Sequence, residues 1–235
     1  MVSFEQALRY PTTSDHWLRN IAVGGILTYL SVFVLPLIFV YGYGIRVISS
    51  SSKGRRTPPQ WSDWMRLFID GVQAWVIGFI YILVPVLVGA VTIGSAVLAL
   101  ATGGEIGAAA SAGTIVVGGF LTVVLTILFG YIGAAGLVNF ARHRSFLAAF
   151  DTSVIVPVIS DRAFGIAYLS TILVLIVVAV IGAIPLIGWI ISPFAAFYGL
   201  LVVGHLLADG FATAIERSGI PVKSAPPVAP SDSTD

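Results

Sequence analysis

The last apolar stretch of the chain ends in two side chains that are able to relay a proton or bind a metal ion. His205 and Asp209 are four residues apart, so they lie on one face of a helix. A metal site needs a third and usually a fourth ligand, and the only other histidines are His16 and His143, while Cys is absent from the sequence. We therefore expect a polar helix end at the lipid headgroups, and we assign no catalytic, cofactor-binding or metal-binding residue.

Basic residues gather in two segments beside apolar stretches, where they are able to bind the phosphate of a lipid headgroup. The first cluster is Lys53, Arg55 and Arg56. The second cluster, with its acidic neighbours, consists of Arg142, His143, Arg144, Asp151, Asp161 and Arg162. Because basic residues next to a span also fix its orientation, each cluster is either a headgroup site or an orientation signal, and we favour orientation.

Polar groups are scarce inside the apolar stretches. Asn139 is the most polar side chain well within one, and in lipid such an amide usually forms a hydrogen bond across helices, so we expect a packing role. No Asp, Glu, Lys or Arg lies near the middle of any apolar stretch. Ion pumps, ion-coupled carriers and ion channels generally hold ions at such charges. Coupled transport is therefore disfavoured, although carriers also use backbone groups where a Pro such as Pro36 or Pro85 breaks a helix.

The elements that carry these residues are apolar helices. Of the 235 residues, 57% are hydrophobic and only 10% are charged, against about 25% charged in an ordinary soluble domain. Asp, Glu, Lys and Arg are absent from residues 21–45, 71–104, 106–141 and 163–208. Since about 20 apolar residues cross the hydrocarbon core of a bilayer, the sequence predicts an all-α, polytopic integral membrane helix bundle. We expect 5 to 6 transmembrane or re-entrant helices and short interfacial amphipathic helices.

The chain divides into three parts. An N-terminal interfacial segment (1–20) precedes a single membrane domain (21–210), and a polar tail (211–235) follows that is expected to be disordered from about residue 219. The expected hydrophobic helices cover about 21–48, 71–101, 114–139, 164–183 and 189–208. Interfacial helices are expected at about 59–70 and 145–150, where aromatic residues favour the headgroup level. The Gly/Ala/Ser-rich residues 102–112 and the turn at 184–188 are expected to link spans.

Residues 21–48 allow two arrangements. One straight helix would need to tilt in the bilayer, and Pro36 near its middle would remove a backbone hydrogen bond. The alternative is a hairpin of two short helices, about 17–33 and 36–52, although Arg46 lies only ten residues from that turn and limits how deeply the hairpin inserts. We favour the hairpin.

The distribution of Lys and Arg predicts the orientation of the chain. Segment 46–70 carries five of them, segment 142–162 three and the tail from Asp209 two, whereas 102–112 and 184–188 carry none. Short loops rich in basic residues face the cytoplasm, so the C-terminus is expected inside, and so is the N-terminus if residues 21–48 form a hairpin. The net charge of +1 gives no case for a nucleic-acid partner.

Five stretches of the sequence together resemble one known group of proteins. The stretches are ALRYP (7–11), DHWLRN (15–20), WSDWMRLFIDG (61–71), SFLAAFD (145–151) and IPLIGWIISPFAAFYGLLVVG (184–204). They resemble the membrane protein family catalogued as domain of unknown function 4013, which occurs mostly in archaea, especially halophiles. The resemblance covers nearly the whole chain up to about residue 210. It implies the family's fold and residence in a membrane, and it assigns no functional residue, because the activity of the family is unknown.

Three kinds of function are compatible with the sequence. We favour a non-enzymatic scaffold or accessory component that acts in the lipid bilayer through helix packing, with a membrane protein partner or a second copy of the chain. Small residues permit close helix contacts, and we expect those in this chain to pack against its own helices, with contact between two copies as the alternative; they are Gly130, Gly133, Gly136, Gly204 and Ala208. The alternative is a carrier, permease or flippase-like protein for an apolar or lipid substrate, which needs no intramembrane charge. The third is a lipid-modifying enzyme that uses His143, His205 or Asp209; we expect that the protein is not an enzyme.

Overall fold

The computed structural model describes residues 4–102 and 104–219, and every regular element in these two ranges is a helix. The elements are α1 (Phe4–Arg9), the 3-10 helix η1 (Tyr10–Thr12), α2 (Trp17–Tyr29), η2 (Leu30–Val32), α3 (Val34–Ser51), α4 (Trp64–Thr102), α5 (Gly104–His143), η3 (Phe146–Phe150), α6 (Thr152–Ser160), α7 (Arg162–Gly182) and α8 (Ile187–Ser218).

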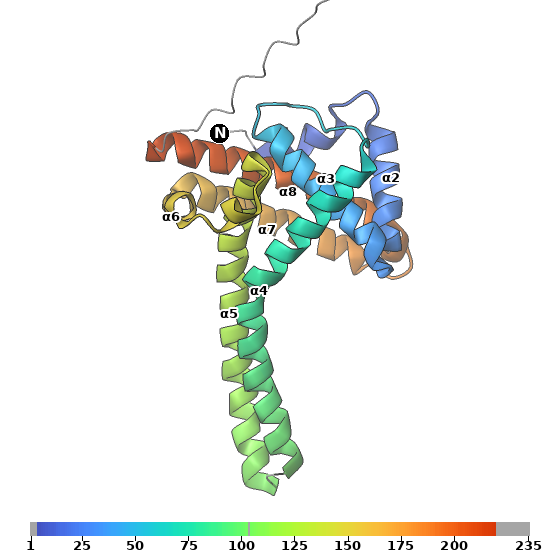
Figure 1. The fold of residues 1–235 in the computed structure, drawn as a ribbon. Helices are drawn as coiled ribbons and strands as arrows, with labels where there is room; N and C mark the ends of the chain where they lie inside the picture. The colour runs from blue at the N-terminus through green and yellow to red at the C-terminus, as the bar shows by residue number, and fades with distance from the viewer. Residues whose placement is uncertain (1–3, 103, 220–235) are drawn as a thin grey trace, which may run out of the picture.

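The helices form a head and an arm (Figure 1). The head contains α2, α3, α6, α7 and α8 with the adjoining ends of α4 and α5, and the arm is the rest of the antiparallel α4–α5 hairpin. With 39 and 40 residues, α4 and α5 are each about 60 Å long, roughly twice the thickness of the hydrocarbon core. Large apolar side chains of the arm, such as Val91, Leu98 and Phe120, are exposed. A hairpin with such surfaces requires apolar surroundings.

Five helices in the described part of the chain are long and apolar enough to cross a membrane. They are α3, α4, residues 111–143 of α5, α7 and α8. This result confirms the predicted class, an all-α bundle of membrane helices, and agrees with the expected number of 5 to 6. Helix α2 has 13 residues and is about 20 Å long, too short to cross the hydrocarbon core by itself.

Residues 21–48 form two helices rather than one long helix. The chain turns at η2 and at Phe33, whose extended backbone (ψ 128°) separates α2 from α3. Pro36 is the third residue of α3, a position where a backbone N–H would have no intrahelical partner. The proline therefore removes no hydrogen bond from the helix. The favoured two-helix arrangement is therefore present, with its turn a few residues before Pro36.

Several predicted boundaries are wrong. No separate helix covers 59–70, because α4 begins at Trp64 and continues without interruption through Pro85 to Thr102. The predicted link at 102–112 is helical from Gly104 onwards, consistent with the strong helix propensity of its alanines. The helix predicted to end at 208 continues to Ser218 and stops at Gly219, which adopts a left-handed conformation (φ 64°). The part of the predicted tail from 220 to 235 lies outside the described residues.

The short elements that follow α5 and those at the N-terminus were not predicted in detail. The interfacial helix predicted at 145–150 is the 3-10 helix η3, and it is followed by α6, which was not predicted from the sequence. Near the N-terminus, α1 ends at Arg9 and the chain continues as η1, which contains Pro11. The side chains at 12–15 do not cap α2, whose N-cap residue is His16.

Glycines bring the helices of the head into direct backbone contact. At the α3–α4 crossing, a Cβ atom on Gly42 would lie 1.9 Å from the carbonyl oxygen of Leu67, and one on Gly71 would lie 1.9 Å from that of Ile38. Only glycine permits this approach. The small residues singled out in α5 and α8 also pack within the chain, because a Cβ on Gly136 would lie 2.6 Å from the carbonyl oxygen of Ala149.

Candidate functional site

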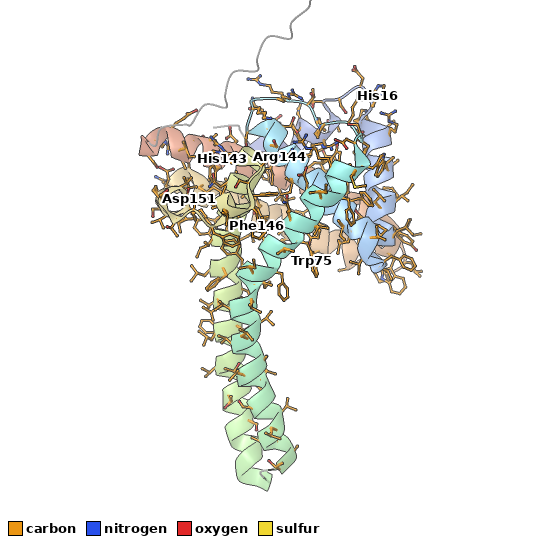
Figure 2. The ribbon with its side chains drawn as sticks, viewed as in Figure 1. His16, Trp75, His143, Arg144, Phe146 and Asp151 are labelled. Atoms are coloured by element: carbon orange, nitrogen blue, oxygen red, sulfur yellow. The ribbon has the colours of Figure 1, made fainter. Side chains whose placement is uncertain are left out.

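Most of the charged residues between 142 and 162 are engaged in contacts within the protein. Asp151 and Asp161 cap α6 and α7 by accepting hydrogen bonds from the backbone N–H groups of Ser153 (3.0 Å) and Ala163 (2.7 Å). The guanidinium of Arg142 lies 5.2 Å from the centre of the Phe211 ring. Figure 2 shows His143, Arg144 and Asp151 where the arm joins the head. These contacts favour a structural role for this segment over a headgroup site.

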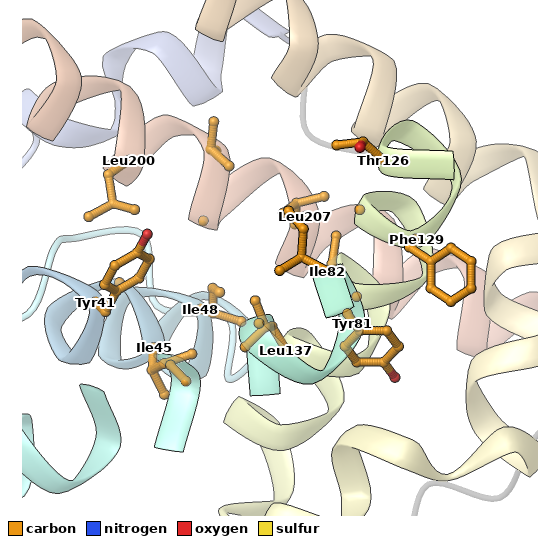
Figure 3. A pocket seen from close by; sticks show the side chains of 18 residues that line it. Tyr41, Ile45, Ile48, Tyr81, Ile82, Thr126, Phe129, Leu137, Leu200 and Leu207 are labelled. Carbon is orange, nitrogen blue, oxygen red and sulfur yellow. The ribbon is translucent and has the colours of Figure 1, made fainter. Parts of the chain in front are cut away.

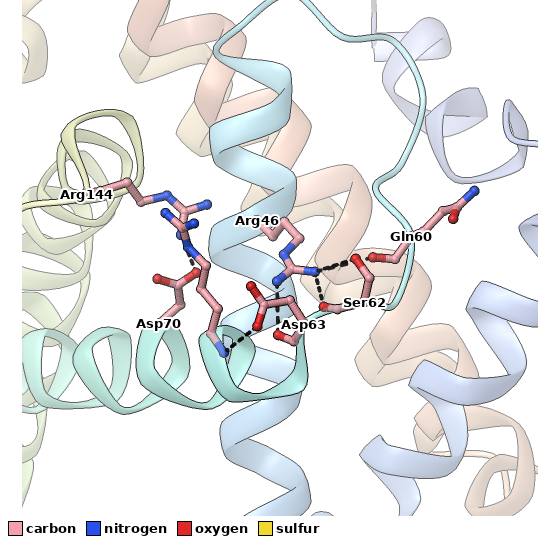
Figure 4. Close-up of polar contacts among 7 residues, drawn as sticks. Arg46, Gln60, Ser62, Asp63, Asp70 and Arg144 are labelled. Carbon is pink, nitrogen blue, oxygen red and sulfur yellow. Dashed lines mark hydrogen bonds and ion pairs between the residues drawn. The ribbon is translucent and has the colours of Figure 1, made fainter. Parts of the chain in front are cut away.

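Arg144 and Asp70 form an ion pair that bridges the end of α5 and the start of α4 (Figure 4). Asp70 is 5% exposed, so the pair is largely shielded from water. Nearby, the guanidinium of Arg46 donates hydrogen bonds to the carbonyl oxygens of Gln60 (3.5 Å) and Asp63 (3.4 Å). Arg46 therefore holds the α3–α4 loop against α3. Sequence reasoning missed the role of Asp70, because a carboxylate just before an apolar stretch gives no sign of which way it points.

His205 is joined to the N-terminal segment and to α3. Its ring stacks on that of Tyr10, with centroids 4.2 Å apart and an interplanar angle of 9°, and its Nδ1 lies 2.9 Å from the hydroxyl oxygen of Ser51. Burial raises the pKa of the Tyr10 hydroxyl above its ordinary value of 10.0, and a hydrogen bond with Ser51 partly offsets this. Asp209 lines the same pocket as His205.

The three histidines are not gathered into one site. Figure 2 shows His16 and His143 at separate places on the head. Within residues 4–102 and 104–219, no three His, Cys, Asp or Glu residues are placed to hold a metal ion. His205 and Asp209 instead belong to a pocket whose other members were not identified from the sequence, since Tyr10 and Ser51 lie in distant parts of the chain.

Asn139 has the packing role expected of it, but its partner is not another span. Its side-chain amide donates a hydrogen bond to the carbonyl oxygen of Ala148 (2.8 Å) in η3. The hydroxyl of Tyr81 donates to the next carbonyl, that of Ala149, at 2.6 Å. Together α4 and α5 thereby fix the backbone of η3 against the base of the arm.

An apolar cavity of about 260 Å³ lies where α3, α4, α5 and α8 meet (Figure 3). Glycines supply part of its wall; these are Gly44, Gly78, Gly130, Gly133 and Gly204. The remaining lining is mostly aliphatic and aromatic, with Ile45, Leu137 and Leu207 among its members. The hydroxyls of Tyr81 and Thr126, which also line it, already donate to the backbone carbonyls of Ala149 and Thr122. The lining is therefore suited to a hydrocarbon ligand.

A second apolar hollow, of about 570 Å³, lies between α1, α2, α7 and α8. Phe4 and Leu8 of α1 line it together with Val174, Phe194 and Tyr198. The hydroxyl of Tyr198 donates a hydrogen bond to the carbonyl oxygen of Leu8 at 2.5 Å, which attaches α1 to α8. The head thus offers two separate apolar hollows between its helices.

The fold defines a polytopic, helical protein of the membrane-spanning class, with apolar hollows between the helices of its head. The chain matches the family described as "Protein of unknown function (DUF4013)" over residues 29–194, more than half of its length, and it belongs to that family. The resemblance drawn from the sequence stretches is therefore confirmed, over a shorter range than the expected one, which reached residue 210. No curated protein and no solved structure matches the chain.

Proposed function

We propose that the protein is a non-enzymatic accessory component of the membrane that holds a hydrophobic molecule, a lipid hydrocarbon chain, in the cavity between α3, α4, α5 and α8. The observation that carries this proposal is the cavity itself, with its glycine-rich apolar wall. The proposal joins the function that we favoured from the sequence, an accessory component, with one part of the alternative, an apolar or lipid molecule as ligand.

The size and lining of the cavity support a bound hydrocarbon. An apolar cavity of about 150 Å³ in another protein stays free of water and binds benzene, and this one measures about 260 Å³. Water is a poor filling, because a buried water needs about two to four polar partners.

Holding a ligand fits the surroundings of the cavity better than moving one. Around it, helices touch through glycines whose neighbours are already close: a Cβ on Gly133 would lie 3.1 Å from Tyr81, and one on Gly204 would lie 3.1 Å from Val47. Such tight crossings resist the relative motion that a carrier needs.

In the same proposal, the protein resides in the cell membrane of an archaeon, with residues 46–70, 142–162 and both ends of the chain on the cytoplasmic side.

A pair of glycine variants in one helix tests the proposal. Gly78 lines the cavity, and a Cβ built on it meets no heavy atom within 4 Å; Gly94 has the same free space but lies outside the cavity. Gly78→Leu therefore places a side chain in the ligand space, and Gly94→Leu is the matched control. The wild type and each variant are purified in mild detergent, and the molecules that remain bound are extracted and identified by mass spectrometry.

We expect a hydrophobic molecule in near-stoichiometric amount with the wild type and Gly94→Leu, and its loss from Gly78→Leu. Equal amounts in all three proteins would show that the molecule lies elsewhere. A stoichiometric protein partner without a bound hydrophobic molecule would contradict the proposal and leave the purely structural scaffold as the function.

A further inference from the structure

We propose that a third hollow, on a different face of α8 from the cavity, is a binding site for a phosphate group, carried either by a lipid headgroup or by a soluble molecule. This phosphate pocket has a volume of about 440 Å³ and lies between α1, η1, the α3–α4 loop and α8. Its charged lining residues are Arg9, Arg55, Arg56 and Asp209, with His205 beside them.

The charges of the phosphate pocket favour an anion. The lining contains three arginines and one aspartate, and although Arg9 also pairs with Glu5 (3.0 Å), positive charge remains in excess. In the described part of the chain, the ion pairs involve neither Arg55 nor Arg56, and both side chains are exposed. The planar guanidinium group matches two phosphate oxygens at once, which makes arginine the preferred residue for this ligand.

The loop that carries Arg55 and Arg56 is held in place by the rest of the pocket. The hydroxyl of Thr13 donates a hydrogen bond to the backbone carbonyl of Arg56 (2.9 Å), and the hydroxyl of Tyr10 donates to that of Thr57 (3.4 Å). At its start, the backbone N–H of Arg55 donates to the carbonyl of Ser50 (3.2 Å). Because the backbone that carries the arginines is positioned before a ligand arrives, binding loses less backbone conformational entropy than it would on a free loop.

The floor of the pocket is closed by the stacked rings of Tyr10 and His205, which are 2% and 8% exposed. A ligand would therefore rest on a rigid aromatic floor with arginines at the rim. His205 and Asp209 lie about 150 residues after the cluster at 53–56 in the sequence, and the fold brings them into one site.

This inference does not depend on the apolar cavity. The cavity is lined by Val203, Gly204 and Leu207 of α8, whereas the phosphate pocket uses His205 and Asp209. Filling one hollow leaves the residues of the other unchanged, so each proposal can fail while the other stands.

Two single substitutions in the same loop test the inference. Arg55→Gln removes one positive charge from the pocket. Lys53→Gln removes one positive charge from the same loop, two residues earlier, and the Lys53 side chain does not line the pocket. Both residues are exposed, so neither change should affect folding, and equal thermal unfolding temperatures verify this. The full-length proteins are placed in nanodiscs of phosphatidylcholine with a minor fraction of phosphatidylglycerol, and retained lipids are counted by native mass spectrometry.

We expect the wild type and Lys53→Gln to retain phosphatidylglycerol selectively, and Arg55→Gln to retain it about tenfold less, the loss of one charge-assisted contact. A parallel titration of detergent-purified protein with inorganic phosphate distinguishes the sources. Thermal stabilisation by phosphate that Arg55→Gln reduces, without lipid selectivity, would assign the site to a soluble phosphate compound. Equal behaviour of Arg55→Gln and Lys53→Gln towards both probes would overturn the inference.

Discussion

The ion pair between Asp70 and Arg144 allows a sharp test of how the arm is joined to the head. Replacement of Asp70 by Ala removes the carboxylate that pairs with the guanidinium of Arg144. In this pair the Asp70 side chain is 7% exposed and the Arg144 side chain is 27% exposed. Breaking a fully buried pair in this way costs about 3–5 kcal/mol. Because Arg144 retains some contact with solvent, we expect Asp70→Ala to lower the free energy of unfolding by about 3 kcal/mol.

A double-mutant cycle in detergent micelles provides the measurement. The free energies of unfolding of Asp70→Ala, Arg144→Ala and the double variant are compared with that of the wild type. We expect the double variant to lose clearly less than the sum of the two single losses, because either single change already breaks the pair. Arg217→Ala is the control, since its pair with Asp161 (3.7 Å) leaves the Arg217 side chain 54% exposed and should be worth under about 1 kcal/mol. Additive losses at Asp70 and Arg144 would refute the reasoning.

Three further predictions follow from the fold. Gly42→Leu should prevent folding, because even a Cβ would lie 1.9 Å from a backbone oxygen, whereas Gly94→Leu should fold; yield of monodisperse protein measures this. Because the pKa of the Tyr10 hydroxyl is raised in the folded state, the neutral hydroxyl adds to the free energy of unfolding. This contribution is complete below the ordinary pKa of 10.0 and is lost as the pH rises through the pKa of the folded state. Above about pH 10, the free energy of unfolding of Tyr10→Phe should therefore fall less steeply with pH than that of the wild type. Equal slopes in the two proteins would contradict this. Because the natural sequence lacks Cys, Lys53→Cys and Thr102→Cys can be labelled singly, and we expect impermeant reagents to reach them from opposite sides of the membrane.

The sequence was sufficient to predict the class of the fold and the approximate positions of the long helices. Runs without charges identify membrane helices because the bilayer imposes length and polarity together. The turn between α7 and α8 was predicted for the same reason, since Pro185 interrupts an apolar run too long for one span. The break between α2 and α3 was predicted from Pro36, although the chain turns earlier, at Phe33.

Hydropathy and composition did not predict where some helices begin or how far they extend. Residues 104–112 contain the glycines and alanines of a flexible link, yet they continue α5, because alanine favours helix and the partner helix α4 packs alongside. Helix α6 was missed although its sequence, TSVIVPVIS, is mostly apolar, because it is short, rich in β-branched residues and contains Pro157; Asp151 caps its first turn. Composition alone did not distinguish a capped helix from a loop.

The candidate sites were predictable only in part. His205 and Asp209 are four residues apart in the sequence, so their proximity was visible. Their meeting with Arg9 and Arg55 depends on how α1 and the α3–α4 loop fold back over α8, which no local pattern encodes. The apolar cavity was likewise invisible, because glycines that pack against a neighbour and glycines that border an empty space look alike in a sequence; Gly136 and Gly78 illustrate the difference.

The central claim, that the cavity between α3, α4, α5 and α8 holds a hydrophobic molecule, is tested most directly by electron cryomicroscopy of the protein in lipid nanodiscs. A bound Fab fragment would supply the mass needed for alignment. We predict continuous elongated density inside the cavity, passing Gly78 and Leu137, that the side chains of the protein do not account for and that is absent from Gly78→Leu. A map in which the helices close the cavity, or in which it contains no density beyond the protein, would contradict the account.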